Sequence, residues 1–173
     1  MEVLRKFCEG VGRISRCTGY VVSFLLPALI ISIVYEVIVR YVFNSPTSWS
    51  FTISFMMGTI IIALGMCYLH ESRGNVRVDL FYNRFPRKLQ LWLDVGLTTV
   101  LFFPLVGMLT KVWFDDTIHA YVVGEVPVTG IFYPLLWPMK ALITIGFALL
   151  FLQGFANFVK DVASLAKGGE EPW

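Results

Sequence analysis

The side chains that could take part in chemistry are few in this sequence, and most of them lie beside long apolar runs. Glu36 and Arg40 are four residues apart, a spacing that places both on one face of a helix and lets them form an ion pair. Lys111 and Asp115 repeat the spacing. Ionisable residues in membrane segments are also often functional, so Glu36 or Arg40 could instead face a partner protein or a substrate carboxylate. We favour the ion pairs.

Lys140 is the charge whose surroundings depend most on where its helix begins. If that helix begins at Ile131, the ammonium group lies about 13 Å inside it at 1.5 Å per residue and needs an anionic partner. If it begins near Pro138, Lys140 lies at the membrane interface and needs none. We favour the second alternative, because a helix from Ile131 to Val159 exceeds the roughly 20 residues that cross a bilayer.

The cysteine and histidine residues do not form a site of known chemistry. Cys8, Cys17 and Cys67 contain no CxxC pair and have no histidine at metal-ligand spacing. They also map toward the cytoplasmic side, which argues against a quinone-linked disulfide oxidant. A b-type cytochrome needs two axial histidines at one depth, whereas His70 lies at the inner end of one helix and His119 in or near an outer loop. The sequence therefore predicts no enzyme, no cofactor and no metal site.

Composition indicates which elements position these residues. Hydrophobic residues make up 57% of the chain and charged residues 15%, and the mean hydropathy is +0.71, whereas a soluble domain has about 25% charged residues. We expect an all-α, integral membrane protein that forms a single membrane domain over residues 1–173. Its predicted segments are an N-terminal amphipathic interfacial helix over 1–16, transmembrane helices over about 17–39, 51–69, 89–114 and 138–159, and a polar cytoplasmic tail over 160–173. The third of these spans should stop at Asp115 and Asp116.

The distribution of basic residues predicts the orientation of the chain, because short loops rich in Lys and Arg stay in the cytoplasm. The opposite side offers Arg40 in the first loop and no basic residue between Asp115 and Trp137, with Lys111 and Lys140 near the outer ends of their helices. Both termini and the second loop should therefore be cytoplasmic. These clusters are separate and form no continuous basic stripe, so we expect no nucleic-acid partner. The cytoplasmic clusters are Arg5, Lys6, Arg13 and Arg16 at the N-terminus, Arg73, Arg77, Arg84, Arg87 and Lys88 in the second loop, and Lys160 and Lys167 in the tail.

Two features of the spans indicate the kind of function: glycines that allow close helix packing, and few polar residues near the middle of the membrane. Gly58 and Gly65 lie near one face of the second span, and Gly146 and Gly154 on the fourth, where they allow another helix to approach closely. A transporter with its own substrate path usually shows repeats, broken helices or midplane polar groups, which this sequence does not show. We therefore favour an auxiliary or scaffold subunit of a larger partner. The alternative is a self-contained, small homo-oligomeric channel or exporter.

Two motifs stand out in the loops between the spans. The first is Arg40-Tyr41-Val42-Phe43-Asn44-Ser45-Pro46 followed by Ser48-Trp49, and the second is Gly74-Asn75-Val76-Arg77-Val78-Asp79 followed by Arg84-Phe85-Pro86 and residues 89–94. Taken in this order and topology, they resemble those of the small membrane subunit of tripartite ATP-independent periplasmic (TRAP) transporters, and the resemblance covers nearly the whole chain. The sequence departs from the family pattern at Ser50-Phe51-Thr52, where acidic residues are usual, and at Asn75, where histidine is usual.

The resemblance implies a multi-pass subunit of the bacterial inner membrane. Its partners would be a large multi-span permease subunit, a periplasmic solute-binding protein and membrane lipids. The complex would import an organic acid with sodium coupling, and the large subunit would hold the sodium and substrate sites. On this hypothesis Arg40, Asn44 and Trp49 help to dock the binding protein; Gly58, Gly65 and Lys140 contribute to interfaces; and Arg77 and Asp79 fix the cytoplasmic loop by a charge pair or a helix cap.

Overall fold

The computed structural model describes residues 2–45, 47–72, 87–127 and 134–166. These residues contain helices and no strand, and four helical segments among them are long and apolar enough to cross a membrane. The predicted fold class, an all-α membrane protein with four spans, is confirmed. The elements are α1 (Glu2–Val42), α2 (Ser50–Glu71), α4 (Arg87–Leu97), the π-helical turn η1 (Thr98–Phe102), α5 (Phe103–Val123) and α6 (Trp137–Ala166).

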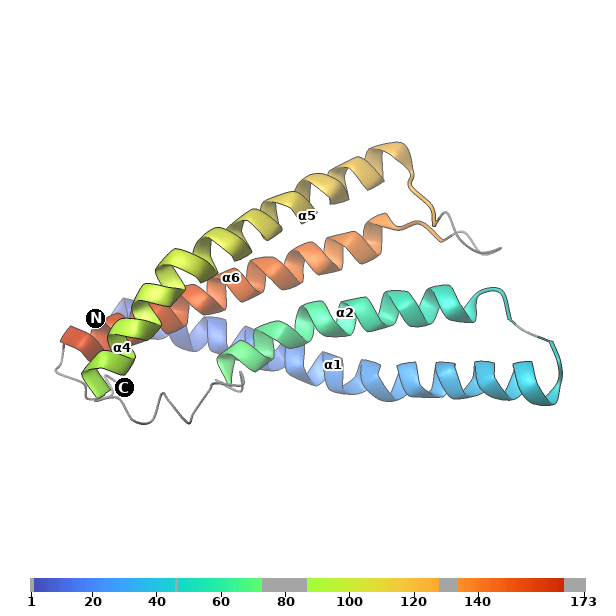
Figure 1. Ribbon diagram of the computed structural model, residues 1–173, viewed down its shortest axis with the longest axis horizontal. Helices are drawn as coiled ribbons and strands as arrows, with labels where there is room; N and C mark the ends of the chain where they lie inside the picture. Colours follow the sequence, from blue (N-terminus) through green and yellow to red (C-terminus); the bar gives the residue numbers. More distant parts are fainter. Residues whose placement is uncertain (1, 46, 73–86, 128–133, 167–173) are drawn as a thin grey trace.

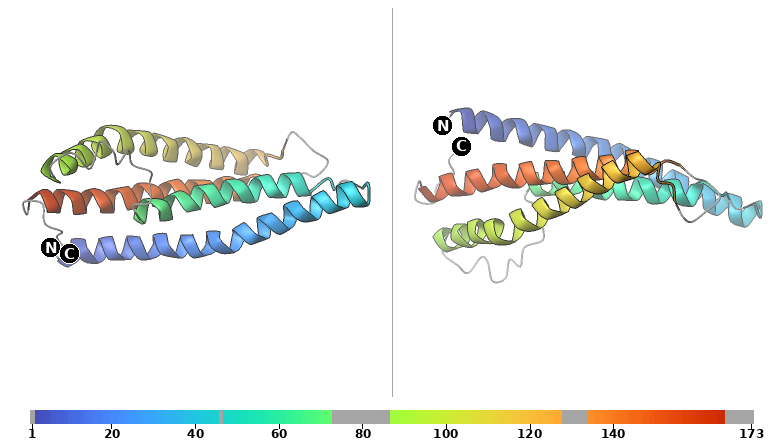
Figure 2. Two further views of the ribbon diagram at one scale, coloured as in Figure 1. Left: turned by 60° about the horizontal axis from the view of Figure 1, so that its bottom comes forward. Right: turned by 90° about the horizontal axis from the view of Figure 1, so that it is seen from above.

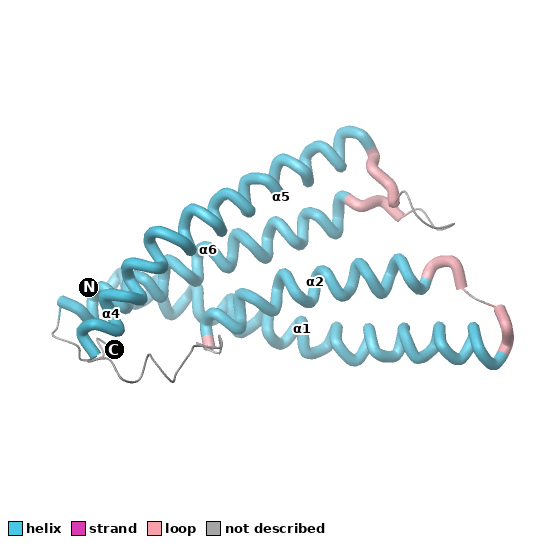
Figure 3. Tube along the Cα trace, viewed as in Figure 1, coloured by secondary structure: helices cyan, strands magenta, loops and turns pink. Residues whose placement is uncertain are grey.

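The helices lie side by side in the order α1, α2, α6, α5, and α1 also contacts α6 (Figure 1). The helices run antiparallel within the pairs α1–α2 and α5–α6, whereas α2 and α6 run parallel to each other, so the bundle has two ends (Figure 3). We call the end where α1 begins and α6 ends the terminal end, and the end with the turns from α1 to α2 and from α5 to α6 the loop end. The two inner helices, α2 and α6, carry more of the buried residues than α1 and α5 do.

The N-terminal segment is helical, as predicted, but it is continuous with the first span, and its place at the membrane interface stays a prediction. No break divides residues 1–16 from the first span, and α1 continues from Glu2 to Val42. Its early residues Cys8 and Val11 are buried against Ala156 of α6, so this part of the chain is held by the bundle. At 1.5 Å per residue α1 is about 60 Å long, roughly twice the thickness of the hydrocarbon core. The helix changes direction in its middle part, where Pro27 lies (Figure 2).

The third span also differs from the prediction, because the helix does not stop at Asp115 and Asp116. It continues to Val123 and ends at Gly124, whose φ of 66° is the left-handed conformation that glycine adopts without a steric penalty. The N–H of Glu125 donates to the carbonyl of Ala120 across this end, at 3.0 Å. Near its start the span contains η1, whose wider turn precedes Pro104, a residue with no N–H to give to the helix.

The fourth span begins at Trp137, with Pro138 in its first turn, and it extends to Ala166. Residues 160–166 are therefore helical and belong to α6 instead of the predicted polar tail, while the rest of that tail lies outside the described residues. One face of the helix stays buried beyond Val159, since Asp161 and Ser164 are buried. The predicted end of this helix, near residue 159, was too early because the prediction considered only the apolar residues.

A buried polar network ties three helices together at the terminal end, and the sequence analysis missed it. The hydroxyl of Ser15 in α1 lies 2.8 Å from Oε1 of Gln153 in α6 and donates to it, and it lies 3.1 Å from Sγ of Cys67 in α2. Gln153 donates to Asn157 at 3.2 Å, and Asn157 donates to the carbonyl of His70 at 3.0 Å. Because each of these links spans separate helices or adjacent turns, the network fixes their register.

Candidate functional site

Two clusters of charged side chains lie at the loop end. The first cluster joins the end of α1 to the turn that follows it. The Nη2 of Arg40 donates to Oε1 of Glu36 at 2.7 Å, and the hydroxyl of Thr47 donates to the other carboxylate oxygen. The predicted pair of Glu36 and Arg40 is confirmed. Half of the Arg40 side chain, 51%, stays exposed, so the guanidinium group has N–H groups left to offer.

Two other residues of the first motif have structural contacts in the same turn. Asn44 has a φ of 51°, in the left-handed region where asparagine is among the better tolerated residues, and this conformation ends α1. The ring of Trp49 stacks on that of Tyr35 with 6.0 Å between centroids. These contacts explain why both residue types suit the turn. A docking role for either side chain stays a prediction.

The second cluster surrounds Lys140, which lies in the first turn of α6. Its ammonium group is 2.8 Å from Oδ2 of Asp116 in α5 and 2.7 Å from Oε2 of Glu125 in the turn after α5. The Lys140 side chain is 12% exposed, whereas those of Asp116 and Glu125 are 41% and 37% exposed. The helix begins near Pro138, as in the favoured alternative, in which Lys140 needs no anionic partner, yet the structure gives it two. The lysine ties α5, the turn and α6 together.

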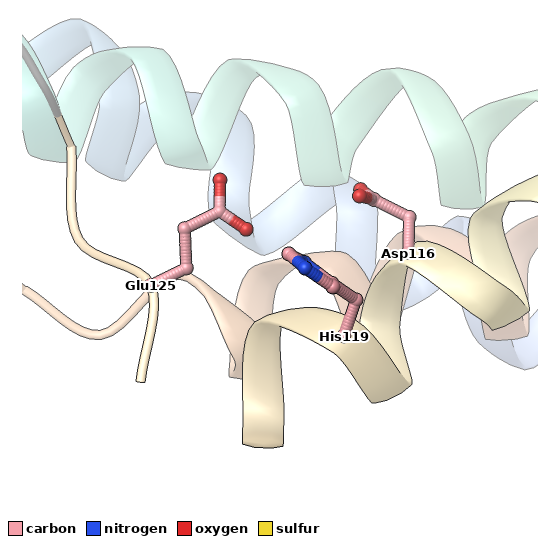
Figure 4. Close-up of side chains that lie close together, drawn as sticks. All are labelled: Asp116, His119 and Glu125. Atoms are coloured by element: carbon pink, nitrogen blue, oxygen red, sulfur yellow. The ribbon is translucent and has the colours of Figure 1, made fainter. Parts of the chain in front are cut away.

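His119 adds a third polar side chain beside the two carboxylates (Figure 4). One ligand atom from each of Asp116, His119 and Glu125 lies within 4.8 Å of the others. Carboxylate and imidazole groups at such distances can bind a metal ion, but here both carboxylates already contact the Lys140 ammonium group. The cluster is thus neutralised in part by a cation of the chain itself, and a metal ion would have to displace it.

Sequence reasoning did not single out Asp116 or Glu125 as partners of Lys140. It took Asp115 and Asp116 as the end of a span, whereas Gly124 is the helix-ending signal that would have kept Asp116 on a helix facing α6. The same reasoning paired Lys111 with Asp115, but among the described residues no ion pair joins them.

The other residues predicted to form interfaces or to fix the cytoplasmic loop differ in their surroundings: some contact another helix, some face open space, and some lie outside the described residues. A Cβ placed on Gly65 would lie 3.9 Å from Val22 of α1, which is ordinary contact, while one on Gly58 would meet no atom within 4 Å. On the fourth span the predicted close approach does occur: at Gly146 of α6 a Cβ would lie 2.8 Å from the carbonyl oxygen of Ala63 in α2, and at Gly154 it would meet the ring of Phe102. Arg77 and Asp79 lie outside the described residues.

Comparison with protein families places these features in a known context. Residues 29–164 match the family described as tripartite ATP-independent periplasmic transporters, DctQ component. The chain belongs to this family. The match covers the last part of the first span, the second and third spans, nearly all of the fourth and both clusters at the loop end, and it confirms the resemblance to the small TRAP subunit. No curated protein and no solved structure matched the chain.

Membership identifies the chain as a multi-pass membrane component of a TRAP complex that contains other subunits. One face of α2 is available for such a contact. Phe51, Phe55, Gly58 and Ile62 recur four, three and four residues apart, which places them on a single helix face. The three large side chains are exposed, and Gly58 between them is open. We call this face the Gly58 stripe.

Proposed function

We propose that this chain is the non-catalytic small subunit of a sodium-coupled, binding-protein-dependent TRAP transporter that imports an organic acid. It acts as a scaffold: it packs against a large permease subunit and widens the rigid framework of that subunit in the bacterial inner membrane. The family match carries this proposal. Sodium and substrate are bound by the large subunit, and this chain holds neither.

The placement of charges supports a scaffold over a substrate pathway. Between the two ends, the spans present mostly apolar side chains outward, and the Glu36–Arg40 pair and the cluster around Lys140 lie near helix ends. A solute with a carboxylate would need a polar path near the middle of the membrane. A scaffold needs exposed apolar faces that another membrane protein can cover, and the Gly58 stripe provides one because glycine allows close helix approach.

The charge distribution supports an orientation with the terminal end in the cytoplasm. Arg13, Arg16 and Lys160 lie toward that end, and Arg16 pairs there with Glu71 of α2. The loop end then faces the periplasm. Arg40, Asn44, Trp49 and the carboxylates around Lys140 would lie there together, on the side from which a periplasmic binding protein docks.

Purification from the native membrane in mild detergent tests the subunit assignment. We expect a permease several times larger than this chain to co-purify and to be identified by mass spectrometry. Gly58→Trp should reduce its recovery by about tenfold or more, because the large ring would hold the partner helix away from α2.

The matched control is Gly96→Trp, a second site where a Cβ meets no atom within 4 Å, and it should leave recovery unchanged. Recovery of this chain alone, as a defined oligomer, would contradict the proposal and favour a self-contained channel or exporter. Equal recovery with both variants would retain the subunit role and remove the Gly58 stripe as its interface.

A further inference from the structure

An unexplained groove lies between α1 and α2 at the loop end, beside the Glu36–Arg40 pair. Its volume is about 250 Å³. The apolar walls include Ile33, Val37 and Phe51, and the polar lining consists of Glu36, Arg40, Ser50 and Ser54. Ile33 precedes Arg40 by seven residues, which places it about 10 Å further along α1 toward the middle of the membrane. The groove is therefore polar toward the loop end and apolar toward the interior of the bilayer.

The buried hydroxyl of Ser50, unpaired within the described part of the chain, indicates that the groove binds a ligand. Ser50 is the first residue of α2, its exposed fraction is 1%, and its hydroxyl oxygen has no hydrogen-bond partner among the described residues. Serine hydroxyls at this depth are normally paired, because leaving one unpaired forfeits the hydrogen bonds that water would make. A partner that enters the groove from outside the chain would supply the missing bond.

Arg40 offers the second contact. Its Nε and Nη2 atoms both donate to Oε1 of Glu36, at 3.2 and 2.7 Å, which leaves Nη1 for another acceptor. Guanidinium groups are well suited to phosphate oxygens. Because Glu36 already balances the charge of Arg40, the long-range attraction between Arg40 and an anionic phosphate is weak. Recognition of the phosphate would therefore depend on direct hydrogen bonds.

We propose that this groove binds a glycerophospholipid, with the phosphodiester accepting hydrogen bonds from Arg40 and Ser50 and an acyl chain lying against Ile33, Val37 and Phe51. The site belongs to this chain and does not depend on the transport role. The polarity of the groove matches an amphipathic molecule whose headgroup lies at the membrane surface. Since the phosphodiester is common to these lipids, phosphatidylethanolamine and phosphatidylglycerol bind with similar affinity.

Lipid is a better occupant than water or a polypeptide side chain. A groove whose walls are mainly apolar holds water poorly, and in a membrane its open side faces acyl chains. A carboxylate side chain of a partner subunit and a lipid phosphodiester would each place one negative charge beside Glu36, where Arg40 can offset it. Only the lipid also brings an acyl chain that can cover the apolar walls of the groove.

The test measures lipid-dependent stability of the full chain, purified with any subunits that remain bound and then stripped of lipid. Added dioleoyl phosphatidylethanolamine or phosphatidylglycerol should raise the thermal midpoint of the wild-type protein with a saturable dependence. Ser50→Ala should require about tenfold more of either lipid for half of that rise, the effect of one hydrogen bond to a charged group. Val37→Trp, which fills the apolar part of the groove, should abolish the rise.

Ser164→Ala is the matched control, because its hydroxyl is paired with the Lys160 carbonyl of its own helix at the terminal end, and it should respond to lipid as the wild type does. Without lipid, Ser50→Ala should be as stable as the wild type or more stable, since it removes an unpaired buried hydroxyl. An unchanged lipid response in Ser50→Ala would overturn the proposal. The proposal would also be overturned if the Ser50→Ala variant lost a bound protein subunit while its lipid response stayed intact.

Discussion

Gly146→Ala is expected to lower the thermal midpoint of the purified chain, whereas the same change at Gly58 is expected to leave it unchanged or raise it. Both glycines lie inside helices, so alanine adds about the same helix propensity at each, close to 1 kcal/mol. Only Gly146 lies against another helix. There the new Cβ would be 2.8 Å from the Ala63 carbonyl oxygen and 2.9 Å from its carbonyl carbon.

These atoms belong to the backbone of α2, so α2 and α6 must move apart to admit the methyl group. Overpacking of this kind costs about 1–3 kcal/mol, which corresponds to a difference of roughly 5 °C between the two variants in a chain of this size. Intrinsic tryptophan fluorescence during heating in detergent would measure it. Equal midpoints for Gly146→Ala and Gly58→Ala would show that α2 and α6 do not approach as closely as described.

Lys140→Met is expected to destabilise the loop end, because it removes the cation between Asp116 and Glu125 and leaves two carboxylates facing each other. Loss of one partner from a fully buried ion pair costs 3–5 kcal/mol. The two carboxylates here are more than a third exposed, so solvent relieves part of this cost and we expect about 1–2 kcal/mol.

The matched control for this change is Lys111→Met on α5. Lys111 is exposed, and among the described residues it has no ion pair, so its substitution should change the midpoint little. Adding Asp116→Asn and Glu125→Gln to Lys140→Met should restore most of the lost stability, because the uncompensated charges are then gone. An effect of Lys140→Met no larger than that of Lys111→Met would contradict the ion cluster.

The spans could be predicted from sequence because a bilayer selects apolar runs of about 20 residues, and their number and type follow from composition alone. The Glu36–Arg40 pair could be predicted too, since both residues belong to one helix and four-residue spacing determines their contact. Contacts between helices were harder. Lys140 reaches Glu125 only because Gly124 ends α5 where it does, and a count of apolar residues does not include that signal.

The ends of the helices and the roles of the glycines were also hard to predict from the sequence. Apolar runs ended the third and fourth spans early, because a helix in a bundle continues past the hydrocarbon core as long as its backbone bonds are made. Gly58 and Gly146 are equivalent as sequence signals, yet one is open and the other touches a backbone. Which of them packs depends on the order of the helices in the bundle, a property of the folded chain.

Under the proposed function, the transporter needs this chain as a scaffold, although the chain binds no substrate itself. Uptake by purified subunits in proteoliposomes, with the binding protein and a sodium gradient supplied, measures that need. We predict that the large subunit with this chain takes up substrate, and that the large subunit alone does so at least about tenfold more slowly. Undiminished, binding-protein-dependent uptake by the large subunit alone would contradict the scaffold role.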